Sequence, residues 1–123
     1  PHHSVSHHLN EAAKIDTLAR IQNYHMQMFA YYLDKLRSTK DGDGTLLDHS
    51  MILYGSNMSN SNLHNHFPLP TVLVGGGAGQ IKGDRHLKYA DYTPMTNLLM
   101  TMLGKLGVPM DKVGDSTGTL ADL

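Results

Sequence analysis

Two groups of histidines are the residues in this chain whose type and spacing could do chemistry. The first group is His2, His3, His7 and His8, which places four of the nine histidines within the first eight residues. If this segment is helical, His3 and His7 lie one turn apart on the same face, because residues four apart in a helix are neighbours. A helix offers two imidazoles to one metal ion in this way. The first group therefore predicts part of a metal site.

The second group is a His-x-His pair, His64 and His66, in a stretch rich in Asn and Ser. The chain has no cysteine, so no thiolate competes with the imidazoles and no disulfide forms. We predict that both groups supply ligands to one metal ion, drawn from His3, His7, His8, His64 and His66. The alternative is that the first residues are a solvated terminus that binds nothing.

The composition predicts one globular domain over residues 1–123, with 40% hydrophobic and 17% charged residues. The net charge is -1, so no basic field is present to hold nucleic acid or an anionic membrane surface. No apolar run is long enough for a membrane span, and no signal peptide is visible. Because the first residue is Pro1, we expect the natural start to lie upstream, removed by processing or truncation.

Two helices are predicted to frame the domain. From residue 9 to residue 37, apolar side chains recur every three or four positions without Gly or Pro, which indicates a long amphipathic helix. The segment Asp41–Gly44 ends it; this segment resembles part of a calcium loop, but Asp and Glu are missing from the first and last ligand positions, so we interpret it as a turn. A second helix is expected with Thr93 as N-cap and Pro94 as its first residue, ending before Gly107.

Two short apolar runs, residues 50–54 and 70–74, are typical of strands buried on both faces, as in parallel sheets. In open α/β sheets the ligand crevice lies beyond the carboxyl ends of the strands. Asn57 and the second histidine group follow the first run, which favours a site there. Arg85, further along the chain, is a candidate for pairing with an anionic substrate group in the same crevice, and a role at the surface is the alternative.

Several motifs together resemble the uncharacterised bacterial family named for its HxxSHH motif. The resemblance covers nearly the whole of this chain but only the carboxyl-terminal part of a family member, which is typically more than twice as long and often begins with an export signal. It implies a secreted or periplasmic location. The motifs are His3-x-x-Ser6-His7-His8, the segment from Leu46 to Ser56, His64-x-His66, Gly75-Gly76-Gly77, Gly83-x-Arg85-His86-Leu87 and the segment from Gly114 to Gly118.

That family is distantly similar to the alkaline phosphatase and sulfatase superfamily, whose α/β enzymes carry metal ions at the carboxyl ends of sheet strands. The resemblance implies that His3 and His7 are the two ligands spaced four apart, and that His66 or His64 is the later histidine of the same metal site. The superfamily's Asp-His pair for a second metal is expected where this chain has Ser56 and Asn57. The part that carries the superfamily's nucleophile has no counterpart here.

We therefore expect an α/β fold in which two long helices pack on a small, at least partly parallel sheet, resembling the carboxyl-terminal part of an alkaline-phosphatase-like fold. So small a sheet has open edges, which predicts a homo-oligomer or a missing amino-terminal domain. Our first hypothesis is a metal-dependent hydrolase that uses Zn²⁺, with Arg85 and Asn57 as candidate catalytic residues and a small anionic or ester substrate. A second is a non-catalytic assembly module whose imidazoles close the coordination sphere. A third, weaker one is copper chemistry, because imidazoles bind Cu²⁺ and Met58 could bind Cu⁺.

Overall fold

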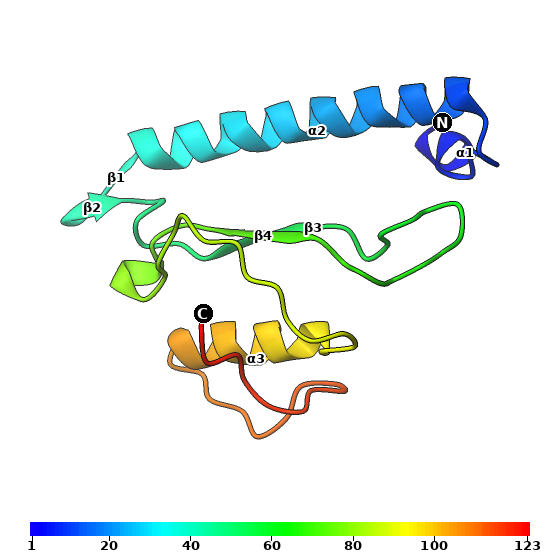
Figure 1. Cartoon of the computed structure of the whole chain (residues 1–123). Helices are drawn as coiled ribbons and strands as arrows, with labels where there is room; N and C mark the ends of the chain where they lie inside the picture. The colour runs from blue at the N-terminus through cyan, green and yellow to red at the C-terminus, as the bar shows by residue number, and fades with distance from the viewer.

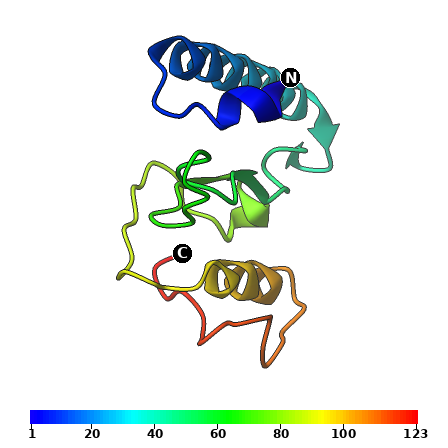
Figure 2. The same ribbon diagram turned by 90° about the vertical axis from the view of Figure 1, so that its right-hand side faces the viewer.

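The computed structural model describes all 123 residues and has a mixed α/β fold in three layers. Figure 1 shows the long helix α2 above a two-stranded sheet, with helix α3 and the carboxyl-terminal tail below it, and Figure 2 shows the same three layers from the side. The elements in chain order are α1 (His2–Ser6), α2 (Ala12–Ser38), β1 (Lys40–Asp41), β2 (Gly44–Thr45), β3 (Ile52–Gly55), β4 (Thr71–Val74), the short 3-10 helix η1 (Gly77–Gly79) and α3 (Met95–Lys105).

Helix α2 confirms the amphipathic helix predicted from residue 9 to residue 37, with its start moved to Ala12. Its half-buried positions recur at Leu18, Ile21, Phe29, Leu33 and Leu36, and this stripe faces the sheet. Within it, the ring of Phe29 stacks on a tyrosine of β3 with centroids 4.3 Å apart. No residue of α2 is fully buried, because only one side of the helix is covered.

The central sheet is antiparallel, so the predicted parallel arrangement is wrong. Strand β3 pairs with β4 in a register that joins Ile52 to Val74 and Gly55 to Thr71. The 15 residues from 56 to 70 that connect the strands contain no helix to carry the chain back across the sheet, so it returns antiparallel. The two strands are apolar on both faces because helices cover both faces of this antiparallel sheet, as they do in a parallel sheet (Figure 1).

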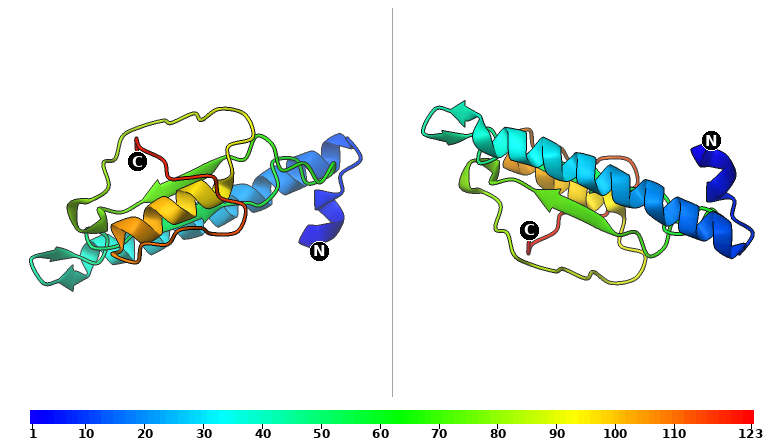
Figure 3. Two further views of the ribbon diagram at one scale, coloured as in Figure 1. Left: turned by 90° about the horizontal axis from the view of Figure 1, so that it is seen from below. Right: turned by 90° about the horizontal axis from the view of Figure 1, so that it is seen from above.

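Antiparallel pairing places the carboxyl ends of the two strands at opposite ends of the sheet. The loop 56–70 therefore lies at one end, beside α1, whereas η1 and the β1–β2 hairpin lie at the other end. Figure 3, which views the molecule from below and from above, shows the same separation. The single crevice expected beyond both strand ends is thus divided into two distant regions.

Helix α3 confirms the second predicted helix but not its predicted cap. Pro94 occupies the N-cap position with extended backbone, while the Thr93 hydroxyl donates a hydrogen bond to the Ala90 carbonyl at 2.7 Å. The buried face of α3 anchors the tail, because the amide of Thr117 donates to the Asn97 side chain at 2.8 Å. Polar hydrogen bonds, as well as apolar packing, hold the lower layer together.

The apolar core is small for a chain of this length. Leu98 of α3 is the one large apolar side chain that is buried, and the accessible surface of the chain is 8629 Å². Many large apolar side chains lie at the surface, above all on α2 and after α3. No helix combines the length and the hydropathy that a membrane crossing requires.

Candidate functional site

The first residues and the loop 56–70 meet at one end of the molecule. Two hydrogen bonds hold these segments together: the Ser61 hydroxyl donates to the Ser6 carbonyl at 2.9 Å, and the Leu9 amide donates to the Asn62 side chain at 2.8 Å. Figure 1 shows α1 beside this loop. The structure thus brings the two histidine groups, which are far apart in the sequence, to the same place.

Three of the predicted ligands form a continuous row of imidazoles. The rings of His3 and His7 have centroids 4.7 Å apart, as expected for residues one helical turn apart. The ring of His7 in turn lies 4.9 Å from that of His64, in the loop. A further contact joins His2 to His25 of α2, with centroids 5.9 Å apart.

The rings meet edge to face or tilted, with interplanar angles of 68° for the first pair and 54° for the second. In this conformation, no three side chains of the types His, Cys, Asp and Glu are placed so that they could hold a metal ion. The row of imidazoles is therefore a cluster whose rings must turn before three of them can share an ion.

His66 lies in the same loop, and its neighbours select its tautomer. Its Nδ1 atom is 2.6 Å from the carbonyl oxygen of Asn57. A carbonyl oxygen only accepts hydrogen bonds, so Nδ1 carries the proton and the lone pair of Nε2 is free. A histidine that donates Nδ1–H to a carbonyl and keeps Nε2 free is in the state that metal ligands adopt.

His8 has the opposite tautomer. Its Nδ1 atom accepts a hydrogen bond from the Asn10 amide at 3.1 Å. The neutral ring therefore carries its proton on Nε2, which then has no lone pair for a metal ion. Among the five predicted ligands, His8 is the one whose local hydrogen bonding opposes coordination.

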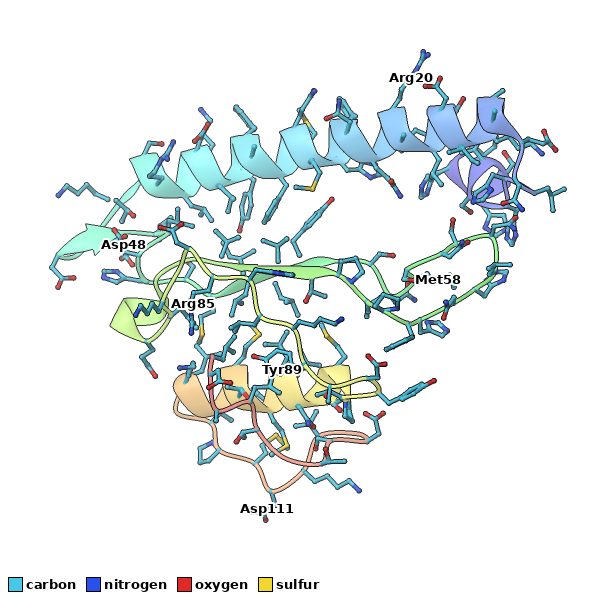
Figure 4. All side chains as sticks on the ribbon, in the orientation of Figure 1. Arg20, Asp48, Met58, Arg85, Tyr89 and Asp111 are labelled. Atoms are coloured by element: carbon cyan, nitrogen blue, oxygen red, sulfur yellow. The ribbon has the colours of Figure 1, made fainter.

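The two candidate catalytic residues lie in different regions. Asn57 is exposed in the loop 56–70, where its backbone carbonyl orients His66. The guanidinium group of Arg85 donates to the backbone carbonyls of Lys82 and Asp122. Figure 4 shows Arg85 at the end of the sheet opposite Met58, which belongs to the same loop as Asn57. Arg85 therefore faces the carboxyl-terminal tail and not the imidazoles.

A charged cluster on the β1–β2 hairpin was not predicted. The ring of His49 lies between two carboxylates, with Nδ1 2.9 Å from Asp41 and Nε2 3.1 Å from Asp43. The hydrogen bond with Asp41 raises the pKa of His49. Hydrogen bonds from the hydroxyl and amide of Thr45 lower the pKa of Asp48. This geometry favours an imidazolium that fastens the hairpin.

The hairpin cluster borders an open depression of about 440 Å³. Its sequence signal was the density of Asp residues around Gly42 and Gly44, which we interpreted only as a turn. Figure 4 shows Asp48 at this end of the molecule, far along the sheet from Met58. The depression is lined by Asp43, Gly44, Asp48, His49, Ala78 and Gly79.

Comparison with known proteins identifies no relative of this chain. No protein-family model, no curated protein and no solved structure matches this chain.

Proposed function

We propose that this chain binds one divalent transition-metal ion, in the first place Zn²⁺, and acts as a hydrolase on an ester-type bond. The observation that carries the proposal is the row formed by His3, His7 and His64. For a hydrolase, His3 and His7 would share the ion with one histidine of the loop, either His64 or His66, whose Nδ1 is hydrogen-bonded to a carbonyl, and the fourth position would stay open for water.

The ring separations support this ligand set. Two imidazoles on one tetrahedral zinc ion, with Zn–N bonds of about 2.0 Å, have ring centroids roughly 5 Å apart. The observed separations of 4.7 Å and 4.9 Å are close to that value. For each of these two pairs, sharing an ion would require the rings to turn about their side-chain torsions.

The proposed reaction follows from the chemistry of the ion. A zinc ion with an open coordination position acidifies water and polarises the oxygen of a phosphate, sulfate or carboxylic ester. The resemblance to the HxxSHH family, and through it to the alkaline phosphatase and sulfatase superfamily, supports this substrate class. Arg85 has no part in the proposal, because its guanidinium group is hydrogen-bonded to the carboxyl-terminal tail.

A non-catalytic metal-stabilised module is the second candidate. The hydrogen bonds from Ser61 to Ser6 and from Leu9 to Asn62 already join the two segments that the ion would link. A fourth imidazole would close the coordination sphere and leave no position for water or substrate. Copper is a third, weaker alternative, since Met58 lies in the loop with His64 and His66 and could bind Cu⁺.

Metal titration of protein purified without a histidine tag tests the site. We expect one Zn²⁺ per chain, and we expect His3→Ala and His64→Ala each to weaken binding at least about 100-fold. His86→Ala is the matched control, because His86 is exposed and lies outside the cluster. Unchanged zinc affinity in both cluster variants would show that the site is wrongly assigned.

Assays with generic aryl phosphate, sulfate and acetate esters then separate the candidate functions. Hydrolysis that requires stoichiometric zinc and is lost in His64→Ala supports the hydrolase. Full zinc occupancy with no hydrolysis of any ester, together with four nitrogen ligands by X-ray absorption, supports the structural module. A redox-active, coloured copper complex that forms in preference to the zinc complex supports the third alternative.

A further inference from the structure

The chain exposes far more surface than a folded monomer of its mass. Its accessible area is 8629 Å², whereas area–mass scaling for monomeric proteins gives roughly 6,600 Å² for a chain of 13.6 kDa. The excess is about 2,000 Å² by the same scaling. Monomers rarely leave so much additional area in water when much of it is apolar.

Part of the excess is an apolar flank on α2. Tyr24, Met28 and Tyr31 lie four and three residues apart, so they form one stripe along the helix. Their exposed fractions are 58%, 45% and 59%. This stripe lies beside the inner face that stacks Phe29 on Tyr54, so it is next to the contact between α2 and the sheet.

The sheet also has an open edge. Strands β3 and β4 form backbone hydrogen bonds only with each other, which leaves the outward groups of both strands unpaired. A cavity lined by Thr71, Leu73, residues 81–87, Tyr89 and Leu123 shows that the segment after η1 and the carboxyl terminus lie beside β4. The outer edge of β3 is therefore the more accessible edge. It carries no charge and no proline, the residues that usually prevent strand pairing.

We propose that a second copy of this chain docks on this surface, with β3 pairing antiparallel with β3 of the other copy. A strand added at this edge enters the space between the α2 and α3 layers, so it must be apolar on both faces. The segment Ile52–Gly55 is such a strand. Because Phe29 places α2 over β3, the same two-fold arrangement brings the second α2 beside the first, stripe against stripe.

The area and the charge both suit this partner. If each copy buries its excess of roughly 2,000 Å², the total of about 4,000 Å² falls within the range of obligate homodimers. The net charge of -1 per chain means that two copies repel each other little. A four-stranded sheet also replaces a two-stranded one, and four strands are the more usual size of a stable sheet. This inference is independent of the metal site.

Light scattering of the whole chain, combined with hydrogen exchange, tests the proposal. We expect a species of twice 13.6 kDa in which all the amides of residues 52–55 are protected. Met28→Glu should raise the dimer dissociation constant at least tenfold. Met26→Glu makes the same change at a methionine of nearly equal exposure, 44%, on the flank of α2 away from the stripe, and should leave the dissociation constant unchanged.

Two results would overturn the proposal. One is a monomer at about 100 µM whose outward β3 amides exchange freely; the edge would then be left for a strand of a different polypeptide. The other is a dimer that Met28→Glu does not weaken and in which the β3 amides remain unprotected, because such a dimer uses another surface.

Discussion

The stacking of Phe29 on Tyr54 allows a quantitative prediction about how α2 is held on the sheet. The rings are 4.3 Å apart with planes at 18°. Full burial of a phenylalanine contributes about 1.5–3 kcal/mol, and an aromatic pair adds about 0.5–1.5 kcal/mol. Because Phe29 is only half-buried, we halve the burial contribution, add that of the aromatic pair, and expect Phe29→Ala to lower the free energy of unfolding by about 1–3 kcal/mol. Urea denaturation followed by far-UV circular dichroism measures this loss.

Gln27→Ala is the matched control on the same helix. Gln27 lies on the side of α2 that faces water, so its truncation should change the free energy of unfolding by less than about 0.5 kcal/mol. Both variants must be measured at one protein concentration, because dimerisation makes stability concentration-dependent. If Phe29→Ala costs no more than Gln27→Ala, the stacked pair does not anchor α2 and the layered arrangement argued from it is refuted.

Three further predictions concern other parts of the fold. Gly75→Ala should prevent folding, because Gly75 has a φ of +107° and an added Cβ would lie 2.1 Å from a backbone oxygen; Gly83→Ala, in open space, should leave the circular dichroism spectrum unchanged. The pairing with Asp41 raises the pKa of His49 above its ordinary 6.5. This pairing therefore stabilises the fold below pH 6.5, and its contribution disappears as the pH rises through the raised pKa. His49→Gln should remove that pH dependence from thermal unfolding curves. Asn97→Ala removes two hydrogen bonds to the tail and should cost about 1–3 kcal/mol in urea denaturation, with faster amide exchange in residues 113–120, whereas tail exchange equal to the wild type would count against this anchoring role.

Local sequence patterns predicted the elements well. The 3.6-residue periodicity identified α2 to within three residues at its start, and the short apolar runs located β3 and β4. Helix α1 meets the condition on which the pairing of His3 and His7 depended, and it places these two rings side by side. These features depend on interactions between residues near each other in the chain, which is why the sequence alone was sufficient.

The sequence could not decide how the strands pair. A run such as Thr71–Val74 is apolar on both faces whether the covered sheet is parallel or antiparallel, so the pattern carried no information on direction. The antiparallel pairing places Arg85 at the opposite end of the sheet from the imidazoles, and it divides the expected crevice into two regions (Figure 4). The open edge of β3, on which the proposed dimer rests, follows instead from the sheet having only two strands.

The sequence by itself determined which side chains are available for chemistry, namely imidazoles in two groups and no thiol. Only the tertiary structure decided which of these imidazoles contact one another and which tautomer each of them adopts. The loop 56–70 places His64 against His7, and single backbone hydrogen bonds give His66 and His8 opposite tautomers. The physical reason is that the tautomer of a neutral imidazole depends on whether a donor or an acceptor lies beside each ring nitrogen. The fold places these neighbours, and the spacing of residues in the sequence does not predict them.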